Sequence, residues 1–309
     1  MEQPWLVYTI EEDVSDHLNI KGYLRGRLEF SRRLVRRLNS QQKIYLNDRP
    51  ARLKDLVRPG DRLFLFPLEE SSPVKVEGAP QVPVLYEDED LLVVDKPAGM
   101  VVHPTKAHQE GTLVQGLQAL FQARGISRGV HLVNRLDRNT SGLVLVAKDP
   151  LGHQRLSRSM GEGRVNRSYL AIVRGYWPSL RLELSLPIRR EPGHPIRREV
   201  HRDGQRAVTH VQLLERCFLA SLLEVDLLTG RTHQIRVHLA AIGFPLVGDE
   251  LYGPGKEEPI HRQALHAHKL AFPHPRTGEA MAFSAPLPGD MQELWSFVRR
   301  SAREDRRCQ

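Results

Sequence analysis

The segment Asn134–Lys148, "NRLDRNTSGLVLVAK", places one carboxylate, Asp137, between two arginines and directly before a cluster of turn-forming residues. Asn, Thr, Ser and Gly in succession are typical of a turn, and the apolar alternation that follows predicts a half-buried strand. An isolated aspartate in such a loop more often bonds backbone amides than takes part in chemistry. The segment therefore predicts a carboxylate at the mouth of a strand, with Arg135 and Arg138 as its first candidate counterions.

Length and charge limit the class of protein. The 309 residues suffice for one large core and a smaller companion, so we expect two domains. The chain has 45 Lys and Arg against 37 Asp and Glu, which gives a net charge of +8. A basic balance of this kind favours a polyanionic partner such as a nucleic acid.

The two cysteines and the apolar content point to a compartment. Cys217 and Cys308 are far apart and have no Cys or His at metal-ligand spacing. This argues against a disulfide framework and a thiolate zinc site, and it favours a reducing compartment. The first residues have no secretory pattern, and no apolar run approaches the roughly 18 residues of a membrane span. We therefore expect a cytoplasmic protein that does not enter a membrane.

Charge and composition divide the chain near residue 68. Between Ile20 and Lys54 there are eleven lysines and arginines and only two acidic residues. After Pro67 the sequence becomes acidic and rich in proline and serine, without a helical period, which is typical of a linker. We predict a small basic domain over residues 1–68, a linker over 69–82, a large domain over 83–298 and a polar tail over 299–309.

The basic segment contains an amphipathic helix. Ser31 suits the N-cap position, and Leu34, Val35 and Leu38 share one face at 100° per residue. Two short strands with Asn-Asp and Pro-Gly-Asp turns follow. A charge stripe alone is more often a solvated helix face than a binding surface. The opposite face of this helix carries what we call the arginine stripe: Arg32, Arg33, Arg36 and Arg37.

The predicted large domain mixes strands and helices without strict alternation. Apolar runs and alternations predict strands within residues 91–94, 142–149 and 164–177, and a turn at "KPAG" separates the first of them from a second apolar run at residues 100–102. A helix beginning near residue 113 is followed by a second one, which Thr232 is expected to cap and Gly243 to stop. Dominant strands with interspersed helices predict an α+β fold with a mixed, largely antiparallel sheet rather than a doubly wound parallel one.

Five motifs give the large domain a specific resemblance. "NRLDRNTSG" is similar to the "H-R-L-D-x-x-T-S-G" signature of the RluA-type pseudouridine synthase family, with Asn134 in place of the usual His. "DKPAGMVVHP", "RSYLAIV", "TGRTHQIRVHLAAIGFPLVGD" and "RQALHAHKLAFPHP" match the same family in the same order. The resemblance implies the pseudouridine synthase fold and an isomerase that acts on uridine in RNA and needs neither cofactor nor metal.

The basic domain also resembles a known module. "SRRLVRRL", "IYLNDRP" and "RPGDRLFLF" follow the order of helix, hairpin and closing strand in the RNA-binding domain named after ribosomal protein S-four. This implies that the arginine stripe contacts RNA phosphates, an interaction that is sensitive to salt and indifferent to sequence. Family members with this domain order often act on large-subunit ribosomal RNA. We therefore expect RNA as the partner, with transfer RNA as the alternative substrate.

The resemblance assigns the catalytic carboxylate to Asp137. Burial alone would raise the pKa of a carboxyl group and neutralise it, so a cation is needed beside it. The family's ion-pair partner matches Arg236, and Arg231 is a weaker candidate for the same neighbourhood. Arg135 and Arg138 are then not needed as counterions of Asp137 and can have other roles.

Three further residues are assigned to the target nucleotide in the same way. Tyr169 matches the family's tyrosine, which stacks on the base and can assist proton removal from carbon 5. Leu265 matches an apolar residue that packs the base from another side. Arg135 matches an arginine near the flipped nucleotide, and flipping is easiest in single-stranded or looped RNA.

Other functions fit only parts of the sequence. An RNA-binding assembly factor without catalysis would lack the aspartate, the tyrosine or the arginine, and all three are present. A hydrolase that uses Ser141 would require a Gly-x-Ser-x-Gly elbow, which "NTSGL" is not. His266 and His268 suggest a metal cluster, but acidic or thiolate partners are missing at ligand spacing. We expect a monomer, and the sequence leaves open the target uridine, the atom that Asp137 attacks and the role of Asn134.

Overall fold

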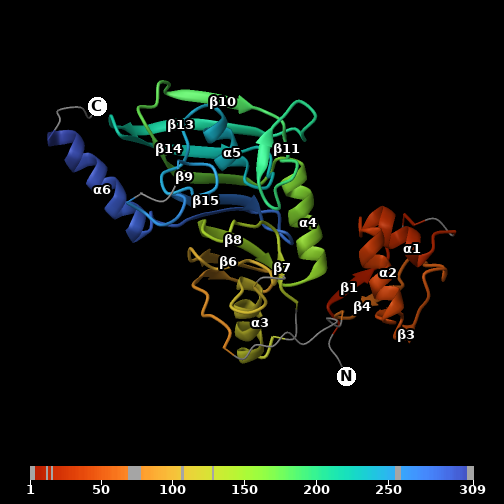
Figure 1. Ribbon diagram of the computed structural model, residues 1–309. Coiled ribbons are helices and arrows are strands. Elements are labelled where there is room, and N and C mark those ends of the chain that lie inside the picture. The colour runs from red at the N-terminus through yellow and green to blue at the C-terminus, as the bar shows by residue number, and fades with distance from the viewer. Residues whose placement is uncertain are drawn as a thin grey trace.

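The computed structural model describes residues 4–11, 13–14, 17–68, 78–105, 108–126, 129–254 and 259–304. A large mixed sheet with flanking helices stands beside a small four-stranded sheet (Figure 1). None of the described helices is long and apolar enough to cross a membrane. The helices are α1 (Ile20–Gly22), the π-helical turn η1 (Tyr23–Arg27), α2 (Arg32–Ser40), α3 (Leu113–Ala123), α4 (Pro150–Gly161), α5 (Gln234–Ala241) and α6 (Gly289–Glu304).

The small sheet belongs to what we call the N-terminal module, the described residues within 4–68. Its strands are antiparallel, in the order β1-β4-β2-β3. Asn47 and Asp48 both have left-handed backbones, with φ of 49° and 65°, which suits the tight turn between β2 and β3. The strands are β1 (Leu6–Thr9), β2 (Ile44–Leu46), β3 (Arg49–Pro50) and β4 (Arg62–Leu65).

Helix α2 confirms the predicted amphipathic helix. The Ser31 hydroxyl accepts a hydrogen bond from the Leu34 amide at 3.2 Å, so Ser31 is the N-cap. Leu34, Val35 and Leu38 are buried in the core of the N-terminal module. The arginine stripe lies on the other side of the helix, where three of its members are exposed and Arg37 is half-buried.

The large sheet has the order β10-β13-β14-β9-β15-β8-β6-β5, with β16 also paired to β15 and β7 to β8. Only the β15–β8 pairing is parallel among the pairings described, so the predicted mixed, largely antiparallel sheet is confirmed. Its strands, with the separate β11–β12 hairpin, are β5 (Val84–Glu87), β6 (Leu91–Lys96), β7 (His131–Leu132), β8 (Ser141–Ala147), β9 (Asn166–Arg174), β10 (Arg181–Ser185), β11 (Ile188–Arg190), β12 (Arg198–Val200), β13 (Val208–Arg216), β14 (Ala220–Leu227), β15 (Leu265–Pro273) and β16 (Ala280–Ser284).

Strand β8 is buried along its whole length, so the prediction of a half-buried strand was wrong. Val144 and Val146 pack into one apolar cluster, whereas Leu143 and Leu145 pack into a second cluster on the other face. A strand covered on both faces reads as a continuous apolar run, and "GLVLVA" has that character. Burial on both faces fixes the position of the loop that precedes the strand.

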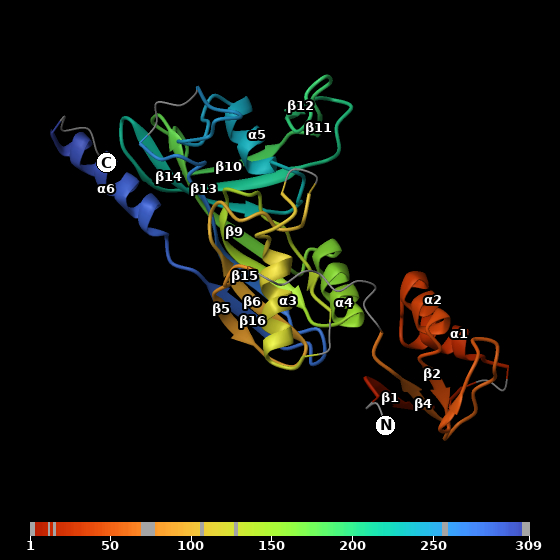
Figure 2. The ribbon, with the colours of Figure 1, turned by 60° about the horizontal axis from the view of Figure 1, so that its bottom comes forward.

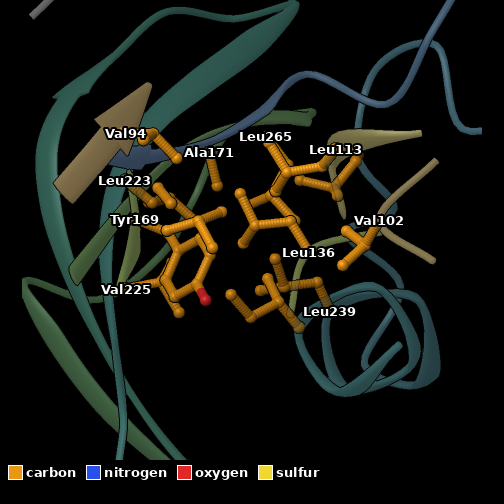
Figure 3. Close-up of a cluster of buried hydrophobic side chains, with 14 of the residues drawn as sticks. Val94, Val102, Leu113, Leu136, Tyr169, Ala171, Leu223, Val225, Leu239 and Leu265 are labelled. Carbon is orange, nitrogen blue, oxygen red and sulfur yellow. The ribbon is translucent and has the colours of Figure 1, made fainter. Parts of the chain in front are cut away.

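One of these clusters surrounds the predicted base-contacting residues. Tyr169 from β9, Leu265 from β15 and Leu136 from the loop before β8 lie together in it (Figure 3). Tyr169 alternates with Ala171 along β9, as predicted, and both point into this cluster. The cluster therefore joins the strand that carries Tyr169 to the loop that carries Asp137.

Two further sequence predictions need correction. Helix α6 continues to Glu304, beyond the predicted start of a polar tail, because Ala302 is buried and Arg299 pairs with Glu215. Cys217 is disulfide-bonded, contrary to the expectation from its isolation in the sequence. The predicted linker residues 69–77 and Cys308 lie outside the described residues.

Candidate active site

Asp137 lies in the loop between β7 and β8. The Thr140 amide donates to the Asp137 carbonyl at 3.1 Å, which closes a turn directly behind the carboxylate. The Asp137 side chain is 27% exposed, so it is accessible without standing free in solvent. This confirms the predicted position of the carboxylate at the mouth of a strand.

The Thr-Ser-Gly sequence attaches this turn to β15. The Gln263 side-chain amide donates to the Thr140 hydroxyl at 3.1 Å, and the Ser141 hydroxyl lies 3.0 Å from His266 Nδ1. Gly142 has φ +111°, and a Cβ added there would lie 2.3 Å from the Ala267 carbonyl oxygen. Only glycine permits this approach of two backbones. The three residues hold the carboxylate loop against a central strand.

Asn134 has a structural role that the sequence left open. Its side-chain amide donates to the Leu143 carbonyl at 3.2 Å, and its oxygen accepts from the Leu145 amide at 2.7 Å. Asn134 is buried and continues the hydrogen bonding of β7 along β8. A carboxamide supplies both the donor and the acceptor that this position requires. Asn134 therefore fixes the start of the Asp137 loop.

Arg236 of α5 forms the predicted ion pair with Asp137, 99 residues away. Arg236 Nη1 lies 3.0 Å from Asp137 Oδ2, and Arg236 is only 8% exposed. The opposite edge of the guanidinium binds both oxygens of Asp249, each at 2.8 Å. Although burial disfavours its charge, the bonds and charge of Asp249, with those of Asp137, hold the pKa of Arg236 above its ordinary value. Arg236 is therefore a fixed cation with one edge turned to Asp137.

Helix α5 begins differently from the prediction. His233, with a left-handed backbone, is the N-cap instead of Thr232. The cap makes no side-chain hydrogen bond, and the Gln234 side chain accepts from the Arg231 amide at 2.9 Å. His233 Nε2 consequently lies 3.8 Å from Asp137 Oδ2, and its Nδ1 lies 2.9 Å from the Tyr252 hydroxyl. Burial lowers the pKa of His233, although the Asp137 charge opposes that shift.

Tyr169 and Leu265 provide an apolar wall beside the ion pair. Both are almost fully buried, at 5% and 4% exposed. Burial raises the pKa of Tyr169, the nearby charge of Arg167 opposes this, and the Asp137 charge adds to it. The apolar cluster that holds Tyr169 and Leu265 also holds Leu136 and Ile235, the chain neighbours of Asp137 and Arg236. The structure therefore brings Asp137, Arg236, Tyr169 and Leu265 into one neighbourhood.

Lys96 is a second buried cation near Asp137. Its amine donates to the carbonyls of Pro97, Met100 and Arg138 at 2.9 to 3.0 Å, and its side chain is fully buried. Burial lowers the pKa of Lys96 to about 7, while the Asp137 charge opposes the shift. Lys96 thereby ties the "DKPAG" turn to the Asp137 loop.

The other predicted arginines lie around the site. Arg135 is exposed, and within the described part of the chain its guanidinium has no hydrogen-bond or ion-pair partner. Arg231 is exposed too, and its Nε donates to the Arg206 carbonyl at 3.0 Å rather than to Asp137. Arg135 is therefore available to an external anion, whereas Arg231 takes no part in the ion pair.

Sequence reasoning missed several of these residues. Asp249 ends a quoted motif, but its pairing with Arg236 across 13 residues has no local signal. His233 and Tyr252 depend on the left-handed start of α5, which a Thr at the preceding position does not suggest. The "DK" of "DKPAG" was a usable signal for Lys96, because a lysine at the end of a buried strand requires acceptors.

The alternative uses of Ser and His do not match the geometry. Ser141 and His266 are 3.0 Å apart but both are buried inside the sheet, where no substrate carbonyl can reach them. Burial lowers the pKa of His266 to about 4. This pair is therefore part of the β8–β15 packing rather than a nucleophile with its base.

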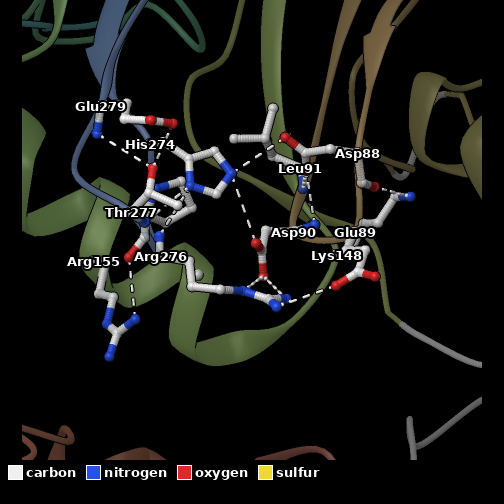
Figure 4. Close-up of polar contacts among 12 residues, drawn as sticks. Asp88, Glu89, Asp90, Leu91, Lys148, Arg155, His274, Arg276, Thr277 and Glu279 are labelled. Atoms are coloured by element: carbon white, nitrogen blue, oxygen red, sulfur yellow. Dashed lines mark hydrogen bonds and ion pairs between the residues drawn. The ribbon is translucent and has the colours of Figure 1, made fainter.

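One group of described residues has the composition of a metal site: Asp88, Asp90 and His274 place ligand atoms within 4.8 Å of one another (Figure 4). His274 Nδ1 accepts hydrogen bonds from the amides of Arg276 and Thr277, at 3.2 and 3.1 Å. Its ring proton therefore sits on Nε2, which faces Asp88 at 3.2 Å and has no lone pair for a metal. The group joins the β5–β6 turn to the β15–β16 turn as a hydrogen-bonded network.

Comparisons with known proteins agree with this geometry. The sequence model of the family described as RNA pseudouridylate synthase matches residues 90–241. An uncharacterized RNA pseudouridine synthase of Bacillus subtilis, YlyB, is 42% identical over 278 residues, covering 88% of this chain and 91% of the relative. The ribosomal large subunit pseudouridine synthase D of Neisseria meningitidis serogroup B is 37% identical over 273 residues, covering 84% and 72%.

A solved structure adds the fold. The human RNA pseudouridylate synthase domain containing 1 superimposes with a TM-score of 0.57 and 27% identity, over 74% of this chain and 98% of that one. The sequence relationship to YlyB extends over nearly the whole of both chains. The chain belongs to the RluA-type family of RNA pseudouridine synthases, isomerases that convert uridine to pseudouridine in RNA.

Proposed function

We propose that Asp137 is the catalytic carboxylate of this pseudouridine synthase and that Arg236 keeps it ionised. The observation that carries the proposal is the 3.0 Å contact between Arg236 Nη1 and Asp137 Oδ2, with Arg236 held on its other edge by Asp249. A guanidinium clamped by one carboxylate cannot rotate away from the second. The charge and the direction of Asp137 are thereby set before RNA binds.

The reaction explains why an ionised carboxylate is required. The bond from N1 of uracil to C1′ of the ribose breaks, a bond from C5 to C1′ forms, C5 loses its proton and N1 gains one. Atoms and electrons balance without an oxidant or a water molecule. A carboxylate next to the sugar or the base can stabilise the electron-poor centre or attack it, as carboxylates do at glycosidic bonds.

The apolar wall suits a base that has left its stack. We assign Tyr169 to stacking against the uracil and to proton removal from C5, and Leu265 to packing the base from another side. Their burial at the edge of the ion pair supports this assignment. Arg135, exposed and without a partner among the described residues, is assigned to the phosphates beside the flipped nucleotide.

We propose that the N-terminal module, within residues 1–68, is an RNA-binding domain like that of ribosomal protein S-four, followed by a linker to a catalytic domain that begins near residue 83. Support comes from the order of the helix, the Asn-Asp hairpin and the closing strand, and from the three exposed members of the arginine stripe. The stripe would contribute affinity without sequence readout. We keep Arg231 as a further RNA contact, because it is exposed near the start of α5.

Large-subunit ribosomal RNA is the proposed substrate, because relatives of this chain act as ribosomal large subunit pseudouridine synthase D. We expect a cytoplasmic enzyme that acts as a monomer. The test is to map pseudouridines in ribosomal and transfer RNA from cells without the gene, restored with the wild-type chain or with Asp137→Asn. Wild type should restore one or more large-subunit positions, and Asp137→Asn should restore none. Restoration only in transfer RNA would overturn the substrate, and restoration by Asp137→Asn would overturn the mechanism.

A further inference from the structure

Helix α4 separates the N-terminal module from the large sheet and contacts both. Asp149 caps the helix, accepting from the amides of Leu151 and Gly152 at 2.8 Å each, and Pro150 occupies the first turn. One face buries Leu156 in the apolar cluster beneath β8. In Figure 1 and Figure 2 alike, the other side of α4 lies next to α2.

The face turned to the N-terminal module has regular helical spacing. Leu151, Gln154, Arg155 and Arg158 stand at i, i+3, i+4 and i+7, which places them on one face of the helix. Leu151 is 3% exposed and belongs to the core cluster of the N-terminal module, although it lies in the catalytic half of the chain. We call these four residues the α4 latch.

Two polar members of the α4 latch, Gln154 and Arg158, bind the module directly. Gln154 accepts from the Ser31 amide at 2.6 Å and donates to the Glu29 carbonyl at 2.7 Å, so it grips the start of α2 by two backbone groups. Arg158 forms a two-point ion pair with the Glu29 carboxylate. Arg155 donates to the Pro275 carbonyl at 3.1 Å. Burial raises the pKa of Tyr8 of β1, and the charge of Arg155 opposes that shift.

The same docking connects the helix that carries the arginine stripe to the strand before the Asp137 loop. The rings of His131 of β7 and His153 of α4 are tilted against each other, with ring centroids 5.9 Å apart. Burial lowers the pKa of His131 to about 4, and the charges of His153, Arg37 and Arg33 add to the shift. Helix α4 holds the start of α2 through Gln154 and also packs against β7. The helix that carries the stripe is therefore connected through α4 to the strand that precedes the Asp137 loop.

We propose that the α4 latch fixes the arginine stripe at one distance and angle from Asp137, and that Gln154 is a specificity-determining positioning residue that limits which uridines reach the site. This rests on the proposed RNA-binding role of the N-terminal module. When the stripe binds RNA phosphates, a uridine reaches Asp137 only if its distance from those phosphates equals the fixed distance between the stripe and Asp137. A module that swings freely would admit many spans and select less.

The test compares two full-length double variants. Gln154→Ala/Arg158→Ala opens the α4 latch. Ser157→Ala/Arg299→Ala is the matched control, because Ser157 is an exposed α4 residue and Arg299 pairs with Glu215 far from the latch. Amide hydrogen exchange at Ser31 should accelerate at least tenfold in the latch variant and not in the control, while the amides of β8 stay protected. An unchanged Ser31 rate would show that the latch does not hold the module and would overturn the proposal.

The functional readout is the pattern of pseudouridines formed in total RNA from cells that lack the gene. The latch variant should lower the ratio of the wild-type position to all other modified uridines at least fivefold. Its turnover on a short stem-loop with the same uridine, and its affinity for total RNA, should stay within twofold of wild type. An unchanged pattern, with Ser31 exchange accelerated, would contradict the proposal.

A third protein separates this failure from failure of the RNA-binding role. A variant with the arginine stripe changed to glutamine keeps the α4 latch. If it binds total RNA as tightly as wild type, the RNA-binding role of the module is wrong. If it binds weakly while the latch variant keeps the wild-type pattern, the RNA-binding role stands and the latch proposal alone falls.

Discussion

Arg236 and the arginine stripe differ in burial and in the contacts that their guanidinium groups make. Arg236 is buried, has carboxylates on two edges and stands at the centre of the candidate active site. The arginine stripe on α2 is mostly exposed at the surface. In the proposed roles, Arg236 acts through the direction of each of its N–H donors, whereas the stripe acts through the number and sign of its charges.

This difference determines where an arginine can be replaced by a lysine. A buried guanidinium with three directed bonds cannot be replaced by an ammonium, because a point charge on a flexible stem does not match two carboxylates. Exposed arginines that meet phosphates through water and counterions tolerate such a change. Changes of the same chemical size should therefore have very different effects in the two regions.

Arg236→Lys is expected to have the largest effect among substitutions of basic residues. It removes the bidentate contact to Asp249 and the fixed approach to Asp137, so kcat should fall on the order of 10²–10³-fold. Arg36→Lys, at an exposed position of the stripe, should leave kcat and RNA affinity within about twofold. Steady-state kinetics on one RNA substrate measure both. Equal effects of the two substitutions would remove the distinction between directed and diffuse charge.

Asp249→Asn tests the bracing of Arg236. Asp249 has a fully buried side chain. In Asp249→Asn the negative charge is removed, and the buried Arg236 keeps only Asp137 as its ion-pair partner. The free energy of unfolding should therefore fall by roughly 3 kcal/mol. Asp290→Asn is the control, because Asp290 pairs with Arg262 but has a 44% exposed side chain. That change should be worth less than about 1 kcal/mol. Urea unfolding measures the free energy of unfolding of both variants. Equal decreases in the two variants would contradict the role of Asp249 in holding Arg236.

Lys96 extends the comparison to a buried cation with a lowered pKa. Below pH about 7 both folded and unfolded states hold the proton, and between about 7 and the ordinary 10.5 only the unfolded state does. The folded state therefore gains stability as the pH rises through this window. The stability of wild type relative to Lys96→Met should increase by roughly 1–3 kcal/mol from pH 6.5 to 9. A difference independent of pH would show that Lys96 keeps its proton throughout.

The arginine stripe should show the smallest effect per residue. Changing all four of its arginines to glutamine should weaken RNA binding about tenfold at physiological salt and flatten the slope of affinity against salt. The rate of isomerisation at saturating RNA should stay within about twofold. Binding titrations at several salt concentrations decide this, since an unchanged slope would place the stripe outside the RNA interface.

Features that depend on a local sequence period could be predicted from the sequence, whereas contacts between distant residues could not be predicted from a local pattern. The stripe, its N-cap Ser31 and the buried face of α2 obey a local period, so the sequence alone was sufficient. The antiparallel sheet followed from dominant strands with few helices between them. The pairing of Asp137 with Arg236 came from the resemblance to a family, because contacts across 99 residues have no local pattern.

Other features could not be predicted, for identifiable physical reasons. Asp249 acts through tertiary burial and a pairing across 13 residues, which periodicity does not report. Thr232 had the chemistry of a cap, but the left-handed backbone of His233 moved the start of α5 by one residue. The role of Asn134 was left open by the sequence, because its carboxamide acts on the backbone of β8, bonding Leu143 and Leu145.

The most direct test of the central claim is single-turnover isomerisation by Asp137→Asn, measured together with RNA affinity. Asparagine keeps the shape of the side chain but removes the charge that Arg236 is placed to hold. The rate should fall at least about 10³-fold, to background, while the Kd for RNA stays within about threefold. Turnover near the wild-type rate in this variant would contradict Asp137 as the catalytic carboxylate.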